Sequence, residues 1–443
     1  MIVTENKIKE SLSLISNEIL NGANFNRSEY ARNILNYPAM MVPSVQEPII
    51  KSLSETFEGE VSLLDPFMGA SNTLVTGMKY GLNIFGQDIN PLSVLLSKVK
   101  TRYYSKDALS TSEESIKIRV QNDTSIKKEV SFHNIDKWFK NDVQIELSRL
   151  YRAIRQESAI EIRQFLWVTL AEVIRLTSND RTSTFKMHIR PTDEIVNRNL
   201  SPQKYFFSIL KRSISDLNDF CSMLSENNFI RKNKYIKDVD VVWGDSLKAI
   251  NTKKIFDLLI TSPPYGDNQT TVTYGQFSYL PLQWIPIEDI DEKITFDYLK
   301  TIQQIDSNSL GGKMIDNFSQ KKENLFQKSK TVRQLFDTFN LDEQIKAKKV
   351  INFVHDLDKT IDNLLAKLNK GAYMVWTVGN RNVNKRVVQN DNILIDLLSS
   401  KKVDLITDLE RDILGKRMPG RNNFSNTMSK EKILIFKIPI NNE

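Results

Sequence analysis

The chain has 443 residues, 40% of them hydrophobic, which is enough apolar material for a large core divided among roughly two or three domains. Its one cysteine, Cys221, excludes a disulfide framework, its three histidines lie too far apart to predict a metal site, and no apolar run approaches the roughly 20 residues that span a bilayer. The net charge of +7 gives a mild attraction to polyanions, which proteins without a nucleic-acid partner also show. Because the first residues, MIVTENKIKESLSLI, lack the layout of a signal peptide, we expect a cytoplasmic protein.

The first part of the chain carries an α/β pattern after a short helical lead-in. The stretch VSLLD predicts a strand that ends at Asp65, and the amphipathic helix that follows it should stop at Gly81. The stretch NIFGQD predicts a second strand, which ends at Asp88. We therefore assign residues 1–104 to the first half of a doubly wound, Rossmann-like α/β core with a parallel sheet.

Two insertions divide the rest of this predicted core. Residues 105–237 have the spacing of charged amphipathic helices and form a large helical insertion. Strand patterns return in VDVVWGDS and FDLLITSPPY, within residues 238–285, before a polar stretch at residues 286–345 that we expect to be a mobile surface region. Residues 346–443 supply the last three strands and a basic loop between two of them.

Polar or turn-forming residues follow four of the predicted strands: Asp65 with Gly69, Asp88, Asp245 and Ser262. Because ligands bind at the carboxyl ends of the strands in such a sheet, these residues should converge on one crevice. Gly69 lets the backbone approach a ligand, Asp88 suits the two hydroxyls of a ribose, and Asp245 suits an adenine amine. The pattern indicates a nucleoside site, although each aspartate taken alone would equally serve as a helix N-cap.

The stretch TSPPY ends the fourth of these strands with two adjacent prolines. Prolines break a strand and stiffen the chain, so Ser262 and Tyr265 should be presented from a rigid turn. The simpler alternative is a strand breaker without a chemical role.

Several stretches together resemble the amino-methylating DNA methyltransferases of restriction–modification systems, which modify cytosine N4 or adenine N6. DPFMGASNT resembles the family's cofactor motif, usually Asp-Pro-Phe-x-Gly-Ser-Gly-Thr-Thr, with Ser71 and Asn72 standing where glycine and threonine are usual. NIFGQDINPLSVLL resembles the ribose-contacting segment, and NYPAMMVPSVQEPII resembles the segment that helps to hold the methionine end of S-adenosylmethionine. TSPPY resembles the catalytic motif.

This resemblance implies S-adenosylmethionine as cofactor. The catalytic residues that it implies are Ser262, Pro263, Pro264 and Tyr265. The cofactor-binding residues that it implies, together with the strand-end pattern, are Tyr37, Pro38, Asp65, Pro66, Phe67, Gly69, Ser71, Thr73, Asp88, Asn90 and Asp245.

The turn residues suit transfer of a methyl group to an exocyclic amine, which is a poor nucleophile because its lone pair is delocalised into the ring. The Ser262 oxygen and the Pro263 carbonyl would accept the two N–H groups of the amine, and Tyr265 offers a face for a flipped-out base. Within the resembled family the serine form is associated mostly with cytosine N4. Adenine N6, an RNA amine and a catalytically silent DNA-binding subunit remain alternatives, whereas methylation at cytosine C5 needs a thiolate that Cys221, in a predicted helix, does not offer.

The resemblance also implies double-stranded DNA as partner and admits a cognate restriction endonuclease. The basic loop GKRMPGRNNFSNTM offers Lys416, Arg417, Arg421, Asn422 and Asn423 for phosphates and base edges, or is simply a solvated hairpin loop. RTSTFKMHIRP and KKENLFQKSKTVR are further basic candidates, and either insertion could read the target or, for the helical one, contact a second subunit. Three aromatic residues after the turn would line a base pocket or pack in the core: Tyr274, Phe277 and Tyr279.

Overall fold

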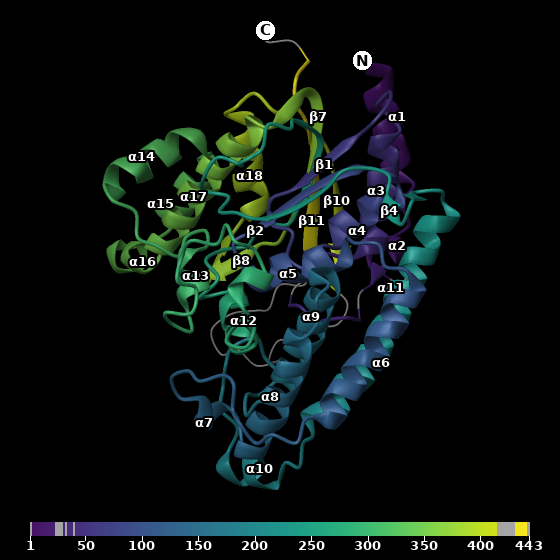
Figure 1. Ribbon diagram of the computed structural model, residues 1–443. Coiled ribbons are helices and arrows are strands. Elements are labelled where there is room, and N and C mark those ends of the chain that lie inside the picture. The colour runs from purple at the N-terminus through teal and green to yellow at the C-terminus, as the bar shows by residue number, and fades with distance from the viewer. Residues whose placement is uncertain (1, 23–29, 32, 39, 414–429, 441–443) are drawn as a thin grey trace.

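The computed structural model describes residues 2–22, 30–31, 33–38, 40–413 and 430–440 (Figure 1). Within these ranges seven strands form one sheet in the order β10-β11-β7-β6-β1-β2-β5. Their bounds are β1 Ser62–Asp65, β2 Asn83–Asp88, β5 Val239–Trp243, β6 Phe256–Thr261, β7 Leu368–Val378, β10 Asp404–Asp412 and β11 Lys430–Lys437. The first two strands end at the aspartates that the sequence predicted.

One strand departs from the parallel sheet that we expected. The strands from β5 to β7 run parallel, whereas β11 runs antiparallel to both of its neighbours, β7 and β10. Strands β10 and β11 follow one another along the chain and lie side by side, and such neighbours pair antiparallel unless a crossover connection intervenes. The Rossmann-like α/β class is confirmed, with this reversed strand as its one difference from a parallel sheet.

Helices cover both faces of the sheet because successive strand residues point to opposite sides. Leu63 and Leu64 of β1, like Val375 and Trp376 of β7, belong to two separate buried clusters. The first cluster includes residues of α3 Pro43–Ser54, α4 Asn72–Lys79 and α5 Pro91–Lys100, and near the N-terminus α1 Ile2–Ser13 and α2 Asn17–Leu20 precede them. The second includes residues of α15 Lys330–Asp337, α17 Lys348–Leu365 and α18 Asn390–Ser399.

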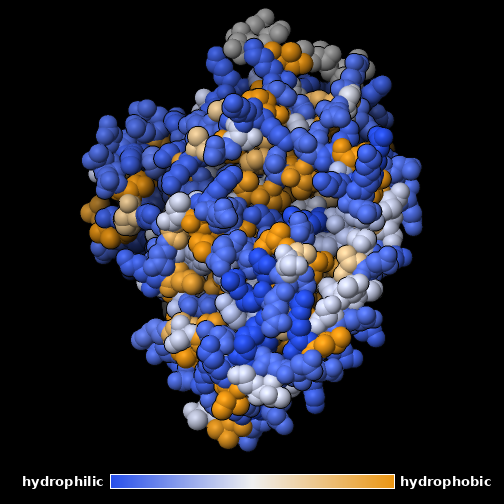
Figure 2. All heavy atoms as spheres, in the orientation of Figure 1, coloured by the Kyte–Doolittle hydropathy of each residue, from blue (hydrophilic) through white to orange (hydrophobic). Residues whose placement is uncertain are grey.

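A helical lobe extends from the sheet in the lower part of Figure 1. Its helices are α6 Lys106–Asn122, α7 Ile135–Trp138, α8 Asn141–Arg155, α9 Ile160–Thr177, α10 Thr192–Asn197 and α11 Pro202–Glu226, and the short strands β3 Ile230–Arg231 and β4 Lys234–Tyr235 follow. The central helix is α9, which packs against α5, α8 and α11. Strongly hydrophilic residues gather over this lobe in Figure 2.

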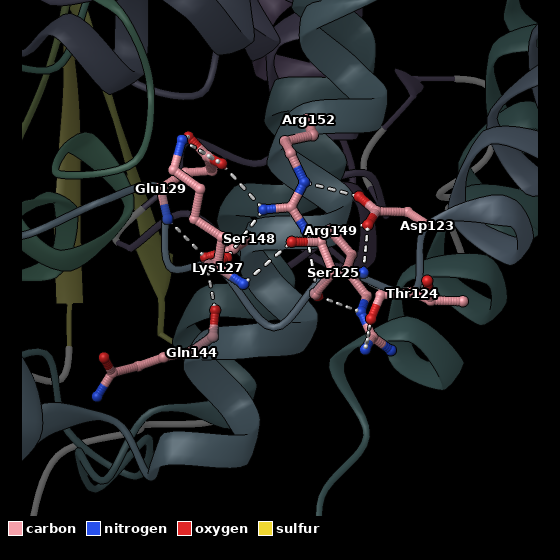
Figure 3. A network of polar contacts seen from close by, with 9 residues as sticks. All are labelled: Asp123, Thr124, Ser125, Lys127, Glu129, Gln144, Ser148, Arg149 and Arg152. Carbon is pink, nitrogen blue, oxygen red and sulfur yellow. Dashed lines mark hydrogen bonds and ion pairs between the residues drawn. The ribbon is translucent and has the colours of Figure 1, made fainter.

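The segment between α6 and α7 is tied to α8 by arginines (Figure 3). Arg152 donates to Asp123 at 2.7 Å and to Glu129 at 3.0 Å, and Arg149 donates to two backbone carbonyls of the same segment. The hydrogen bond from Arg152 lowers the pKa of Asp123. Charge-assisted hydrogen bonds of this kind fix an extended segment that has no helix or strand of its own.

Residues 286–345, which we expected to be a mobile polar region at the surface, contain short helices. They form η2 Ile287–Asp289, α13 Gln304–Asn308, α14 Phe318–Lys328, the helix α15 and α16 Leu341–Lys346. Val332, Leu335 and Phe336 bury one face of α15, although the polar composition around them hides this pattern. Across the described ranges, no helix is both long and apolar enough to cross a membrane.

Candidate active site

A cavity opens beside the carboxyl ends of β1, β2, β5 and β6, with an empty volume of about 870 Å³, part of it open to solvent. The strand ends therefore converge as expected, and nine of the predicted residues line the cavity: Tyr37, Pro66, Phe67, Gly69, Asp88, Asn90, Asp245, Ser262 and Pro264. The sequence analysis missed other lining residues, among them Met41, Met68, Asn72, Ser246, Asn268 and Leu310.

Asp65 is fully buried at the end of β1 and links this strand to β6. Its Oδ1 accepts hydrogen bonds from the Phe67 N–H at 3.1 Å and from the Thr261 hydroxyl at 2.7 Å. Burial raises the pKa of Asp65 to about 6, against the effect of the Thr261 hydrogen bond. Its Oδ2 makes no hydrogen bond within the described part of the chain. The nearby Thr73 hydroxyl also lowers the pKa of Asp65, so this side chain and a ligand or water are the candidate donors there.

The loop after β1 is held against Asp88 at the end of β2. Asp88 Oδ2 accepts from the Gly69 N–H at 2.9 Å, and its Oδ1 accepts from the Asn90 N–H at 2.8 Å. Gly69 has a φ of +47°, in the left-handed region that glycine adopts most easily. Burial raises the pKa of Asp88. Each carboxylate oxygen keeps lone-pair capacity for a ligand hydroxyl.

A buried lysine, which the sequence analysis missed, supports the same loop. Lys100 is 2% exposed, and its Nζ donates to the Ala70 carbonyl at 2.7 Å and to Asn72 Oδ1 at 2.8 Å. Ser71, where the resembled family has glycine, takes a left-handed φ of +61°, and its hydroxyl forms a hydrogen bond with that of Ser97. The sequence could have predicted this buried lysine, because Lys100 ends the apolar stretch LLSKVK, whose helix α5 is largely buried.

Aromatic residues form another part of the cavity wall. The Tyr37 and Tyr274 rings stack with their centroids 5.9 Å apart, and Asn90 Nδ2 donates to the Tyr37 hydroxyl at 2.9 Å. Tyr274 begins α12 Tyr274–Leu282 and lines the cavity, whereas Phe277 and Tyr279 of this helix are buried in the core.

The turn after β6 places Ser262 and Pro264 in the cavity wall. The Tyr265 hydroxyl lies 3.3 Å from Ser262 Oγ and donates to Glu431 Oε1 at 2.8 Å. Burial, reinforced by the charge of Glu431, raises the pKa of Tyr265 well above its ordinary value. The tyrosine is thus tied to β11, a contact that the sequence analysis did not anticipate.

Asn390 and the ion pair of the buried Asp267 with Lys349 also hold this turn. Asn390 Nδ2, at the start of α18, donates to the Tyr265 carbonyl at 2.9 Å and to the Gly379 carbonyl at 2.8 Å. Asp267 is fully buried and pairs with Lys349 Nζ at 3.1 Å. A small two-stranded sheet, β8 Arg381–Val383 and β9 Arg386–Val388, lies beside Asp267. An Arg381 nitrogen of this sheet is 3.6 Å from Asp267 Oδ2.

Some predicted residues lie outside the cavity lining or outside the described ranges. Pro38, Asp65, Ser71, Thr73, Pro263 and Tyr265 do not line the cavity, and Thr73 Oγ1 accepts instead from Gln46 Nε2. The predicted DNA contacts at Lys416, Arg417, Arg421, Asn422 and Asn423 lie outside the described residues. Cys221 is buried in α11, as expected, and burial raises its pKa to about 11. The described residues contain no group of three or more side chains that could hold a metal ion.

Comparison with known proteins finds a curated relative that matches almost the whole chain. The chain is 30% identical over 444 aligned residues to the Type II methyltransferase M.MvaI of Kocuria varians, covering 96% of this chain and 95% of that protein. It is 33% identical over 78 residues to the Type II methyltransferase M.MjaII of Methanocaldococcus jannaschii, covering 18% of this chain and 14% of that protein. No family model matches. The solved rRNA methyltransferase aviRa of Streptomyces viridochromogenes aligns over 93% of both chains, with 9% identity and a TM-score of 0.35.

Proposed function

Because the chain belongs to the type II DNA methyltransferases of restriction–modification systems, which use S-adenosylmethionine, we propose that it methylates the exocyclic N4 amine of cytosine in duplex DNA. The observation that carries this proposal is the position of Ser262. Its side chain stands in the wall of the same cavity that Asp88, Asn90 and Asp245 line. One cavity thus offers nucleoside-binding carboxylates and an amine acceptor.

The residues of this cavity fit S-adenosylmethionine, which supplies an electrophilic methyl group on a sulfonium. Asp88 would accept from the ribose hydroxyls, and Asp245 would accept from the adenine amine. Asp65 does not itself line the cavity, so its buried Oδ2 would attract the ammonium of the methionine end through a water. The stacked pair of Tyr37 and Tyr274 would close the apolar side.

The turn residues would prepare the target amine for attack. Ser262 Oγ and the Pro263 carbonyl would accept its two N–H groups, which draws the nitrogen toward tetrahedral geometry and directs its lone pair into the cavity. Pro263 and Pro264 keep the carbonyl rigid. Since an amine inside a duplex cannot reach Ser262, the base would be flipped out, at a cost of a few kcal/mol. It would stack on the partly exposed ring of Tyr265, beside the cavity lining.

We place one DNA-contacting segment in the loop between α9 and α10. Arg181, Lys186 and His188 are exposed there, as phosphate contacts require. The loop is attached to the start of α12, because Thr273 donates to the Phe185 carbonyl at 3.0 Å. It therefore lies close to the cavity wall formed by Tyr274.

The proposal is tested by nucleoside mass spectrometry of DNA and RNA from an undermethylated host that expresses the protein. We expect N4-methylcytosine in DNA, and its loss in Ser262→Ala while S-adenosylmethionine binding persists. N6-methyladenine would keep the mechanism and overturn the choice of base. New methyl groups in RNA alone, or none at all with a purified protein that binds the cofactor, would contradict the proposal.

A further inference from the structure

A chain of polar contacts connects Ser262 to the far strands of the sheet. Arg411 of β10 and Glu431 of β11 stand opposite each other in the register of the two strands. An Arg411 nitrogen lies 3.2 Å from Glu431 Oε2, and Glu431 Oε1 accepts from the Tyr265 hydroxyl at 2.8 Å. The Tyr265 oxygen in turn lies 3.3 Å from Ser262 Oγ. The side chains of Arg411 and Glu431 are only 8% and 16% exposed, so water competes little for these contacts.

The available hydrogens determine which group donates in each of these contacts. A guanidinium only donates, and a carboxylate paired with it only accepts. The Tyr265 hydroxyl must therefore donate its single hydrogen to Glu431. Burial raises the pKa of Tyr265, so the phenol keeps that hydrogen. The Tyr265 oxygen can then only accept from Ser262, and the serine is the donor of the 3.3 Å contact. Long hydrogen bonds between catalytic groups commonly tighten when the substrate is bound.

We propose that Glu431, held by Arg411, is a positioning residue that turns the Ser262 hydrogen toward Tyr265, so that the serine oxygen faces the target amine as an acceptor. This inference rests on the proposed function of Ser262. A serine hydroxyl can donate or accept, unlike a carboxylate at the same position. A turn that uses serine therefore needs another group to orient the hydroxyl hydrogen. Glu431, which lies 166 positions after Tyr265 in the sequence, supplies that group from strand β11.

Glu431→Gln tests the direction because it should reverse the chain without changing its shape. Arg411 can only donate, so the introduced amide would turn its oxygen to Arg411 and its NH₂ to Tyr265. Tyr265 would then donate to Ser262, and the serine hydrogen would point at the amine. Tyr265→Phe removes the hydroxyl but keeps the ring, so it leaves Ser262 free to rotate. Adding Tyr265→Phe to Glu431→Gln should therefore restore part of the lost rate.

The measurement is the single-turnover rate of methyl transfer at saturating cofactor and DNA, with cofactor Kd and thermal unfolding recorded for each variant. We expect a fall of about tenfold or more in Glu431→Gln, a smaller fall in Tyr265→Phe, and a double variant that matches Tyr265→Phe, all with a wild-type cofactor Kd. Glu410→Gln is the matched control, since Glu410 lies on β10, is exposed and pairs with Lys430. It should keep the wild-type rate.

Two results would overturn the inference: a wild-type rate in Tyr265→Phe, or a double variant slower than Glu431→Gln. If Glu431→Gln does not fold, the rate of Tyr265→Phe decides alone. A wild-type protein that methylates no amine would instead refute the proposed function, so the two failures are distinguishable.

Discussion

The loop after β1 and the turn after β6 border the same cavity, but the chain holds them in different ways. The loop is fixed mostly by nearby residues: Gly69 bonds to Asp88, 19 positions away, and Ala70 to Lys100, 30 positions away. The turn is fixed from a distance, since Tyr265 bonds to Asn390 and to Glu431, 125 and 166 positions away. The Gly69–Ala70 part of the cofactor loop is thus a local unit, although Asp65 and Pro66 before it bond to Thr261 and Ser246. The catalytic turn is instead held by a remote helix and a remote strand.

This difference predicts two kinds of variant. Changes to the local unit should alter cofactor affinity, because its partners form one βαβα segment whose contacts close short loops. Changes to the remote supports should alter the rate of methyl transfer and leave cofactor affinity intact. The three experiments below test this division, from the largest expected effect to the smallest.

Replacing the buried lysine should have the largest effect. Lys100→Met leaves the Ala70 carbonyl and Asn72 Oδ1 without the ammonium that satisfies them. Each of these two buried groups left unpaired costs about 1–3 kcal/mol, so we expect a loss of about 2–6 kcal/mol in the free energy of unfolding, with weaker cofactor binding. Urea unfolding and calorimetric titration measure both. Lys106→Met, at an exposed residue of α6, is the control, and equal effects in the two variants would refute the role of Lys100.

Cofactor affinity should depend on pH through Asp65, whose pKa burial raises to about 6. As the pH falls through 6, Asp65 gains a proton and loses its attraction for the ligand ammonium, so Kd should rise by about tenfold at pH 5. Folding responds in the opposite sense. The folded-state pKa lies above the ordinary 3.8, so the cost of charging buried Asp65 is present above pH 6 and is relieved as the pH falls toward 4. Calorimetric titrations of the cofactor at pH 5 to 8 measure the change in Kd. In Asp65→Asn the Kd should depend much less on pH.

The smallest effect is expected at the remote support of the turn. Asn390→Ala removes the donor to the Tyr265 carbonyl, so methyl transfer should slow by about fivefold while the cofactor Kd stays unchanged. Asn392→Ala, at an exposed residue of the same helix, should change neither quantity. A raised cofactor Kd in Asn390→Ala, with an unchanged rate, would break the division between the two sides.

The sequence predicted the fold class, the first two strands and the meeting of Asp88, Asp245 and Ser262, because these depend on local patterns and on a general property of α/β sheets. It missed the helices of residues 286–345, where few apolar residues such as Val332 and Phe336 are spaced among polar ones. It also missed Lys100, because a lysine is usually assigned to the surface unless its buried acceptors are known.

The amino-acid sequence was enough to show what each strand end carries: an aspartate at the end of β1 with a glycine in the loop behind it, an aspartate at the end of β2, and a serine before two prolines after β6. These are properties of short segments, and elementary chain geometry places them at one edge of a sheet. The distant groups that support them became visible only in the folded protein. The pairing of Arg411 with Glu431 follows from the register of β10 and β11, and the contact of Glu431 with Tyr265 follows from the place of β11 in the sheet. Register and strand order depend on the packing of the whole core, and no short segment contains that information.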